Sequence, residues 1–335
     1  MRLRDLALST LVVLDAACVV VPSILHLTLV DGIPGAVCMD GSPGGYYYSG
    51  ATSSANATKL VLYIDGGGEC RSAEQCTQWA SGGGTAGGSS DRWPQESKLQ
   101  SYTPMDGELS TNPDFHDWAK VRIPYCSGDM HSGTTSEPVE ELGGYYFAGH
   151  SLIEAAVAHL KANHFPEGHD LTDLLLTGDS AGGIAVLTHV DWFAENFPMA
   201  SVRGNPGCGF FYSRLTAFDD FDCADRQNNT APPTATSKLG FLEAWEPWFH
   251  EACSQQTSGN MSACTDASTL LPHIVTPLFI MWVTSYLPAS LPAFLPSCLL
   301  LPSGKLHLPL SLFRPRCLIH SVPASCPYTS QGESV

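Results

Sequence analysis

The sequence predicts an α/β fold with a mostly parallel central sheet flanked by helices. Unbroken apolar runs at 60–64 and 174–176 are typical of strands that are buried on both faces of a parallel sheet. Helix-like patterns at 149–163 and 181–196 alternate with such strands, which favours parallel pairing. The chain has 335 residues and is 44% hydrophobic, so it can form one large domain with a sizeable core.

The remaining elements follow in chain order. Residues 30–50 are expected to form a short strand, a Gly/Pro turn and an aromatic strand, and residues 81–90 a Gly/Ser-rich surface loop. Further strands are expected within 59–64, 117–126, 171–177 and 276–281, an irregular polar segment over 202–232, and an aromatic stripe at helical spacing over 241–253.

Both ends of the sequence differ in composition from the middle. Residues 1–22 are predicted to be a signal peptide or an N-terminal anchor, because Arg2 and Arg4 precede a short apolar run. Residues 282–335 are predicted to be a poorly ordered tail rich in Pro and Leu, since frequent proline prevents both helix and interior strand. The domain itself is placed at 27–281.

Charge and cysteine content point to a secreted protein. The formal net charge of −17 argues against binding to nucleic acid or to anionic membrane surfaces. Twelve cysteines without zinc-type spacing favour disulfides, and the pairs Cys70/Cys76 and Cys253/Cys264 could each close a small loop. N-glycosylation sequons begin at Asn56, Asn228 and Asn260. No metal or cofactor is expected; the acidic residues between 219 and 225 fit a solvated face better than a calcium loop.

The segment Gly178-Asp179-Ser180-Ala181-Gly182 matches the G-x-S-x-G nucleophile elbow and lies between a predicted strand and a predicted helix. Glycines on both sides allow the strand and helix to approach, and the helix N-terminus with the Ala181 N–H favours a developing oxyanion. The motif is short enough to occur by chance. A trypsin-like protease is disfavoured because Ala181 replaces a glycine and the α/β pattern does not suit a double β-barrel.

A second glycine-rich segment, Asp65-Gly66-Gly67-Gly68, follows the first buried strand. A glycine loop at this point of an α/β-hydrolase supplies backbone N–H groups to the oxyanion hole. A phosphate loop is set aside because no Gly-Lys-Ser/Thr follows, and a plain flexible turn is the remaining alternative.

Five stretches in order resemble the pectin acetylesterase / Notum carboxylesterase family. They are 27–30 with 35–46, 63–70, 123–129 with 132–133, 178–183 and 271–280, and they include Ile123-Pro124-Tyr125-Cys126-Ser127-Gly128-Asp129. The resemblance implies an α/β-hydrolase fold and a secreted serine carboxylesterase. It implies Ser180 as the nucleophile and Gly67, Gly68 and the Ala181 N–H as the oxyanion hole. One departure is Glu69, where the family tends to carry an aromatic residue.

The resemblance also implies a catalytic Asp after the strand near 278–281 and a later His. No carboxylate occurs in 282–286, and His320 matches the family's His only superficially. His273 precedes the strand and suits a structural role. The triad acid and His are therefore not identified, and activity of this chain is left open.

The expected function is deacetylation of a polysaccharide through Ser180 by a secreted monomer without a cofactor. The alternatives are a non-catalytic secreted binding protein and a Notum-like protein deacylase. The expected partner is an acetylated polysaccharide or another acyl ester, with membrane association only if the N-terminal segment is uncleaved.

Overall fold

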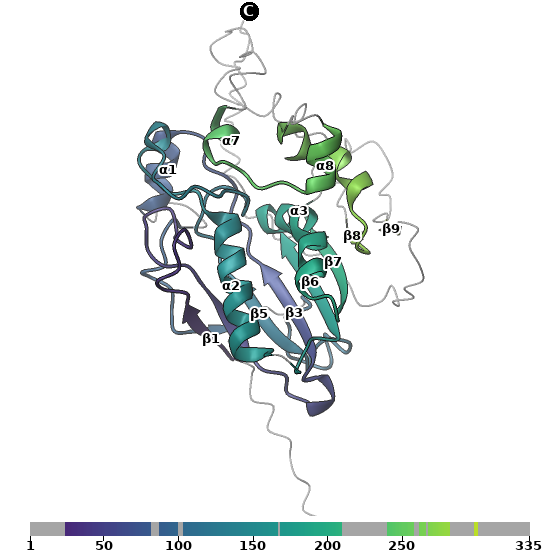
Figure 1. Ribbon diagram of the computed structural model, residues 1–335. Helices are drawn as coiled ribbons and strands as arrows, with labels where there is room; N and C mark the ends of the chain where they lie inside the picture. Colours follow the sequence, from purple (N-terminus) through teal and green to yellow (C-terminus); the bar gives the residue numbers. More distant parts are fainter. Residues whose placement is uncertain are drawn as a thin grey trace, which may run out of the picture.

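The computed structural model describes residues 24–81, 87–99, 103–166, 168–209, 240–257, 261–265, 267–281 and 298–300. In this part of the chain a seven-stranded mixed sheet carries two long helices, α2 and α3, on one face (Figure 1). The elements are β1 (Ile24–Leu29), β2 (Gly45–Ser49), η1 (Ser54–Asn56), β3 (Lys59–Ile64), α1 (Ala73–Ala80), β4 (Glu96–Lys98), β5 (Ala119–Ile123), η2 (Glu140–Leu142), α2 (Gly149–His164), β6 (Asp173–Asp179), α3 (Ala181–Asn196), β7 (Ser201–Gly207), α7 (Gly240–Ala244), α8 (Glu251–Gln256), η3 (Met261–Thr265), α9 (Ala267–Leu270), η4 (Leu271–His273), β8 (Phe279–Met281) and β9 (Cys298–Leu300).

The strand order of the large sheet is β4-β1-β2-β5-β3-β6-β7. Strands β5, β3, β6 and β7 are parallel to one another, whereas β4, β1 and β2 extend the sheet by antiparallel pairing. The predicted α/β class is confirmed, and its parallel half supplies the carboxyl edge at which the predicted site lies. A short antiparallel pair, β8 with β9, stands outside this sheet, although Leu278 bridges to Gly204 of β7.

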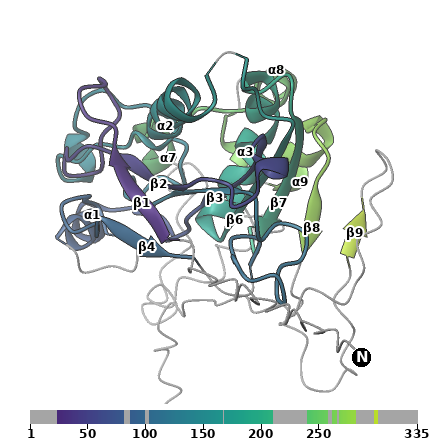
Figure 2. The same ribbon diagram turned by 90° about the horizontal axis from the view of Figure 1, so that it is seen from below.

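The alternation of side chains along β3 shows how the sheet separates two cores. Leu60, Leu62 and Ile64 point into the larger core, which α2 and α3 cover with their apolar faces. Val61 and Tyr63 point to the other face and pack with Met105 and other residues that lie outside the helices. Figure 2 shows the strand order from β4 and β1 through β3 and β6 to β7 from below. Both faces of β3 are therefore apolar, as the sequence pattern predicts.

Two predicted segments differ in the structure. Strand β7 occupies the start of 202–232, which was expected to be irregular, and Gly204 allows β7 to pass close to Leu278. The aromatic stripe over 241–253 is not one helix. Glu246 has φ 47° and Pro247 follows it, so α7 ends and α8 begins only at Glu251.

Both suggested cysteine pairs are confirmed as disulfides, and a third joins Cys38 to Cys126. Several expectations lie outside the described residues: the N-terminal segment, most of the C-terminal tail, the sequons at Asn228 and Asn260, the acidic cluster and His320. Among the helices that are described, none is both long and apolar enough to cross a membrane.

Candidate active site

Ser180 occupies a sharp turn between β6 and α3. Its backbone has φ 52° and ψ −121°, a strained conformation for a residue with a side chain. The helix begins at the next residue, Ala181, as the sequence predicts. Because Ser180 immediately precedes α3, its hydroxyl lies at the positive end of the helix dipole. Ser180 is only half-buried, so the hydroxyl remains accessible.

Three glycines let the neighbouring segments approach this turn. A Cβ at Gly178 would lie 2.7 Å from the Gly182 backbone, and a Cβ at Gly182 would overlap the Ile64 carbonyl. A Cβ at Gly66 would overlap the Asp179 carbonyl oxygen and lie 3.0 Å from the Ser180 Cβ. Real Cβ contacts are not this short, so glycine is required at the point where β3, β6 and α3 converge.

The same contacts bring the glycine loop to the nucleophile turn. Gly67 is half-buried, and Gly68 is exposed with φ 88°. Within the described chain, neither N–H donates a hydrogen bond to a protein acceptor. The Ala181 N–H opens α3 and therefore has no acceptor within the helix. The structure thus brings together all four predicted site residues, Ser180, Gly67, Gly68 and Ala181.

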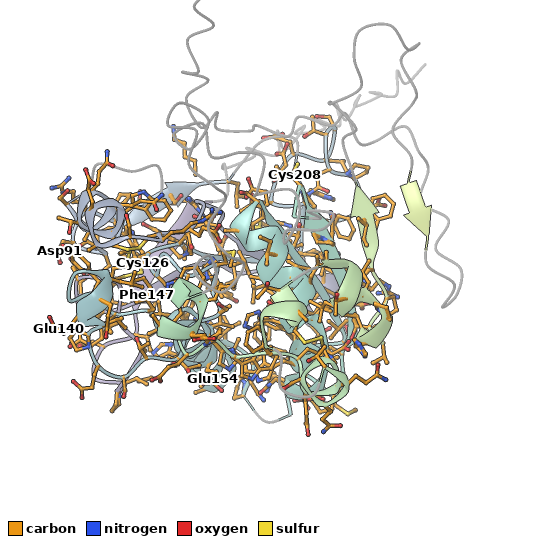
Figure 3. The ribbon with its side chains drawn as sticks, turned by 90° about the horizontal axis from the view of Figure 1, so that it is seen from above. Asp91, Cys126, Glu140, Phe147, Glu154 and Cys208 are labelled. Atoms are coloured by element: carbon orange, nitrogen blue, oxygen red, sulfur yellow. A yellow bond between two sulfur atoms is a disulfide. The ribbon has the colours of Figure 1, made fainter. Side chains whose placement is uncertain are left out.

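Glu69, the departure from the family pattern, is buried and forms an ion pair with Arg71. The pair balances the carboxylate charge beside the glycine loop. The loop ends at the Cys70–Cys76 disulfide, and the Trp79 ring packs against Gly68. Figure 3 views this end of the molecule from above, with Cys126 and Phe147 among the surrounding loops and Cys208, which follows β7, well separated from them.

No catalytic base reaches the nucleophile within the described residues: no imidazole there forms a hydrogen bond with the Ser180 hydroxyl. Asp179, which precedes the nucleophile, accepts a hydrogen bond of 2.5 Å from the Tyr63 hydroxyl. His273 lies half-buried in η4, before β8.

One buried acid–imidazole pair was not predicted. His250 Nε2 lies 2.8 Å from Asp191 Oδ2, and the same carboxylate accepts the N–H groups of Val275 and Thr276. These hydrogen bonds hold the Asp191 pKa at about 2, below its ordinary value, although burial opposes them. Asp191 lies eleven residues along α3 from Ser180, or ~16 Å at the helical rise, so this pair cannot act on the nucleophile. Through its hydrogen bonds to Val275 and Thr276, Asp191 connects α3 to the segment that precedes β8.

Three further histidines, His131, His150 and His189, form a buried histidine cluster. His150 Nδ1 and His189 Nε2 are 3.0 Å apart, and the Trp248 ring stacks on both. Burial lowers the pKa of His131 and of His150 to about 4 and lowers that of His189 well below its ordinary value. The three rings are therefore neutral near pH 7. No periodic pattern in the sequence could have revealed them, because their neighbours come from distant segments.

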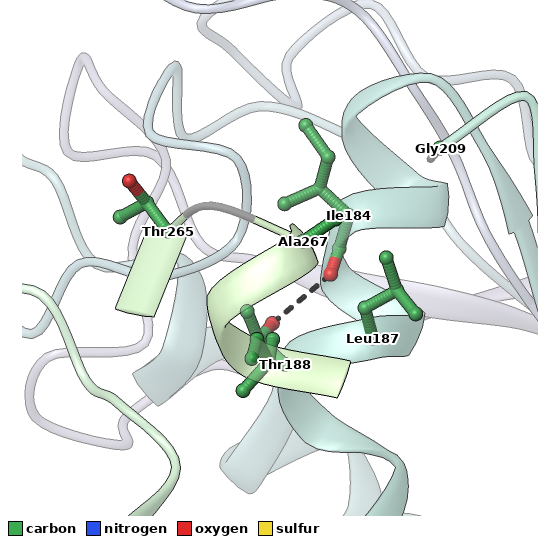
Figure 4. Close-up of a pocket in the computed structure, with 7 residues that line it drawn as sticks. Ile184, Leu187, Thr188, Gly209, Thr265 and Ala267 are labelled. Carbon is green, nitrogen blue, oxygen red and sulfur yellow. Dashed lines mark hydrogen bonds between the residues drawn. The ribbon is translucent and has the colours of Figure 1, made fainter. Parts of the chain in front are cut away.

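A small apolar pocket begins one helical turn beyond Ser180 (Figure 4). Ile184 and Leu187 of α3 form one wall, and Ala267 of α9 faces them. The Thr188 hydroxyl, which also lines the pocket, donates to the Ile184 carbonyl at 3.2 Å.

Sequence comparison relates this chain to pectin acetylesterases and to Notum carboxylesterases. A family model described as Pectinacetylesterase matches residues 21–286. Pectin acetylesterase 5 of Arabidopsis thaliana is 30% identical over 258 residues, covering 77% of this chain and 56% of that protein. The Homo sapiens palmitoleoyl-protein carboxylesterase NOTUM is 30% identical over 266 residues, covering 77% of this chain and 49% of that protein.

A solved structure shares the fold of this chain. The crystal structure of the Wnt deacylase Notum from Drosophila superposes with a TM-score of 0.63 at 24% identity, covering 76% of this chain and 70% of that one. The chain spans about half the length of the curated relatives that it matches. On the extent of the family match, the chain belongs to the pectin acetylesterase family.

Proposed function

We propose that this protein is a secreted carboxylic ester hydrolase with Ser180 as its nucleophile. The observation that carries the proposal is the strained serine at the start of α3, placed beside a glycine loop whose N–H groups have no acceptor in the described chain. The N–H groups of Gly67, Gly68 and Ala181 are assigned to the oxyanion hole. Backbone donors fixed in advance stabilise a developing oxyanion without reorganisation.

The chemistry would be acyl transfer. The Ser180 oxygen bonds to the ester carbonyl carbon, and its proton passes to a base. The carbonyl oxygen becomes an oxyanion between the three N–H groups. The ester C–O bond then breaks, the alcohol leaves with a proton, and water releases the acyl group as an acid.

Turnover by this chain is proposed to be slow. No described imidazole bonds the nucleophile. Loss of triad members lowers rates by ~10⁴–10⁶ and leaves ~10³–10⁴ over water from the oxyanion hole and binding.

The proposed substrate is an acetylated polysaccharide, by analogy with the relatives named pectin acetylesterase. A protein deacylase is the second candidate, because relatives named palmitoleoyl-protein carboxylesterase match at similar identity. The domain is proposed to span 27–281 and to act as a monomer after secretion. Residues 1–22 would provide the signal peptide, or an anchor if uncleaved.

Covalent labelling tests the proposal. A fluorophosphonate probe followed by peptide mapping is expected to modify Ser180 slowly in the folded protein during a long exposure, and neither heat-denatured protein nor Ser180→Ala should react over the same time. Folded protein that gives no adduct at Ser180 would contradict the esterase and support a non-catalytic binding protein. Acetyl and longer-chain esters, compared on the reactive protein, then separate the two substrate candidates.

A further inference from the structure

We propose that Tyr125 and His131 are positioning residues that hold the glycine loop in the conformation of an oxyanion hole. The inference rests on the proposed function of that loop. Each side chain forms a hydrogen bond with one carbonyl oxygen of the loop. The intervening N–H groups of Gly67 and Gly68 then stay available to a substrate oxygen.

The contacts bracket the loop at both ends. His131 Nε2 lies 2.9 Å from the Asp65 carbonyl oxygen, and the Tyr125 hydroxyl donates to the Gly68 carbonyl at 2.7 Å. Both side chains belong to buried residues, 1% exposed for His131 and 2% for Tyr125. Hydrogen bonds in such a setting are strong because water does not compete.

The loop needs this restraint because it consists of three glycines. Glycine populates left-handed and right-handed backbone regions about equally, so its peptide planes can flip at little cost. A flipped peptide would point a carbonyl oxygen where a donor is required, and two oxygens with negative charge repel. The two hydrogen bonds hold the peptide planes on either side of the two planes that carry the Gly67 and Gly68 N–H groups, so the intervening planes must keep a conformation that fits fixed ends of the loop.

The direction of the Tyr125 bond is fixed by its second partner. The Met130 N–H donates to the Tyr125 hydroxyl oxygen at 2.7 Å. A hydroxyl has one proton, so Tyr125 must direct that proton to the Gly68 carbonyl.

The turn that carries His131 is itself held in a strained form. Met130 and His131 are consecutive non-glycine residues with φ 57° and 60°. Asp129, fully buried, accepts hydrogen bonds from the Ser127 hydroxyl and from the N–H groups of His131, Gly133 and Gly149. Strain that is compensated by such a network is typical of positions where geometry matters to function.

The His131 ring uses only one of its two nitrogens. Nε2 faces a carbonyl acceptor and therefore carries the proton, whereas Nδ1 is buried without a partner among the described residues. An apolar ring would fill this space without the cost of an unpaired nitrogen. The Nε2–H donor to Asp65 accounts for a histidine here.

The test compares Tyr125→Phe, His131→Leu and His131→Gln. Gln can present an N–H near the position of Nε2, whereas Leu cannot. For Tyr125→Phe and His131→Leu we expect the rate of Ser180 phosphonylation to fall by ~10–100-fold, less than the ~10²–10³ for loss of a hole donor itself. His131→Gln is expected to restore most of the rate. Tyr47→Phe is the matched control, since the buried Tyr47 also donates to a backbone carbonyl, that of Pro94, on the opposite face of the sheet.

A second readout does not depend on reactivity. NMR relaxation of the ¹⁵N-glycine amides is expected to show lower order parameters for Gly67 and Gly68 in Tyr125→Phe and His131→Leu, but not in His131→Gln or Tyr47→Phe. Unchanged relaxation in the first two folded variants would overturn the inference, as would equal effects of Leu and Gln at position 131. If the wild-type protein is not phosphonylated, the proposed function fails, while the relaxation data still decide this inference.

Discussion

Replacing Gly182 with Ala tests the packing that places Ser180 beside the glycine loop. The new Cβ would overlap the Ile64 carbonyl oxygen and lie 2.8 Å from both the Ile64 carbonyl carbon and the Asp65 carbonyl oxygen. All three are backbone atoms, so no side-chain rotation relieves the clash. The end of β3 or the start of α3 must move.

Overpacking a protein interior typically lowers the free energy of unfolding by ~1–3 kcal/mol. Because this clash is with the backbone of a central strand, we expect a loss near the upper end, about 3 kcal/mol. For a domain of this size that corresponds to a fall in Tm of ~6–12 °C. Thermal unfolding followed by circular dichroism measures the shift, and fluorophosphonate labelling measures the expected loss of Ser180 reactivity.

Gly50→Ala is the control, because a Cβ there would be 3.7 Å from the Tyr48 hydroxyl, an ordinary contact. Its Tm should stay within about 2 °C of the wild-type value. A Gly182→Ala protein with wild-type Tm and wild-type labelling would show that this close backbone packing does not position Ser180.

Three further predictions concern turnover, packing and pH. The chain should hydrolyse p-nitrophenyl acetate only slowly because no described imidazole bonds Ser180; turnover typical of a good esterase, lost in Ser180→Ala, would contradict this. Asp191→Ala removes the acceptor of the buried Thr276 N–H, of the part-buried Val275 N–H and of the His250 ring, and should cost ~2–4 kcal/mol in urea unfolding; an effect below ~0.5 kcal/mol would contradict the structural role of Asp191. In the folded protein the pKa of His131 is about 4, below the ordinary 6.5, so between these pH values the unfolded state binds more protons than the folded state. The contribution of neutral His131 to the free energy of unfolding is therefore lost as pH falls from about 6.5 to 4. In His131→Gln the free energy of unfolding should therefore fall less steeply with decreasing pH, by ~1.4 kcal/mol per pH unit, because this position no longer takes up a proton on unfolding. A slope equal to that of the wild type would contradict a buried, neutral His131.

The sequence was most informative where chemistry and local backbone coincide. The limits of α3, Ala181 to Asn196, could be predicted because a glycine-flanked serine marks its start and Pro198 follows its end. The glycine loop could be placed at the same edge because parallel strands bring their carboxyl ends together.

Other features depend on contacts that a sequence does not display. Strand β7 contains Gly204 and Pro206, which suggest a turn, yet the close approach of Leu278 requires a glycine there. The aromatic stripe at Trp245 and Trp248 has helical spacing, but Pro247 interrupts it and Trp248 stacks on the histidine cluster instead. The left-handed turn at Met130 and His131 carries no glycine, so sequence rules for positive φ could not find it.

In the proposed oxyanion hole, a substrate oxygen at Ser180 is held by the N–H groups of Gly67, Gly68 and Ala181. A crystal structure of the phosphonylated protein tests it most directly, because the phosphonyl oxygen stands in for the oxyanion. We expect an adduct on Ser180 whose oxygen lies ~2.7–3.1 Å from these three nitrogens. An adduct oxygen that faces solvent or a side chain, with the three N–H groups bonded elsewhere, would contradict it.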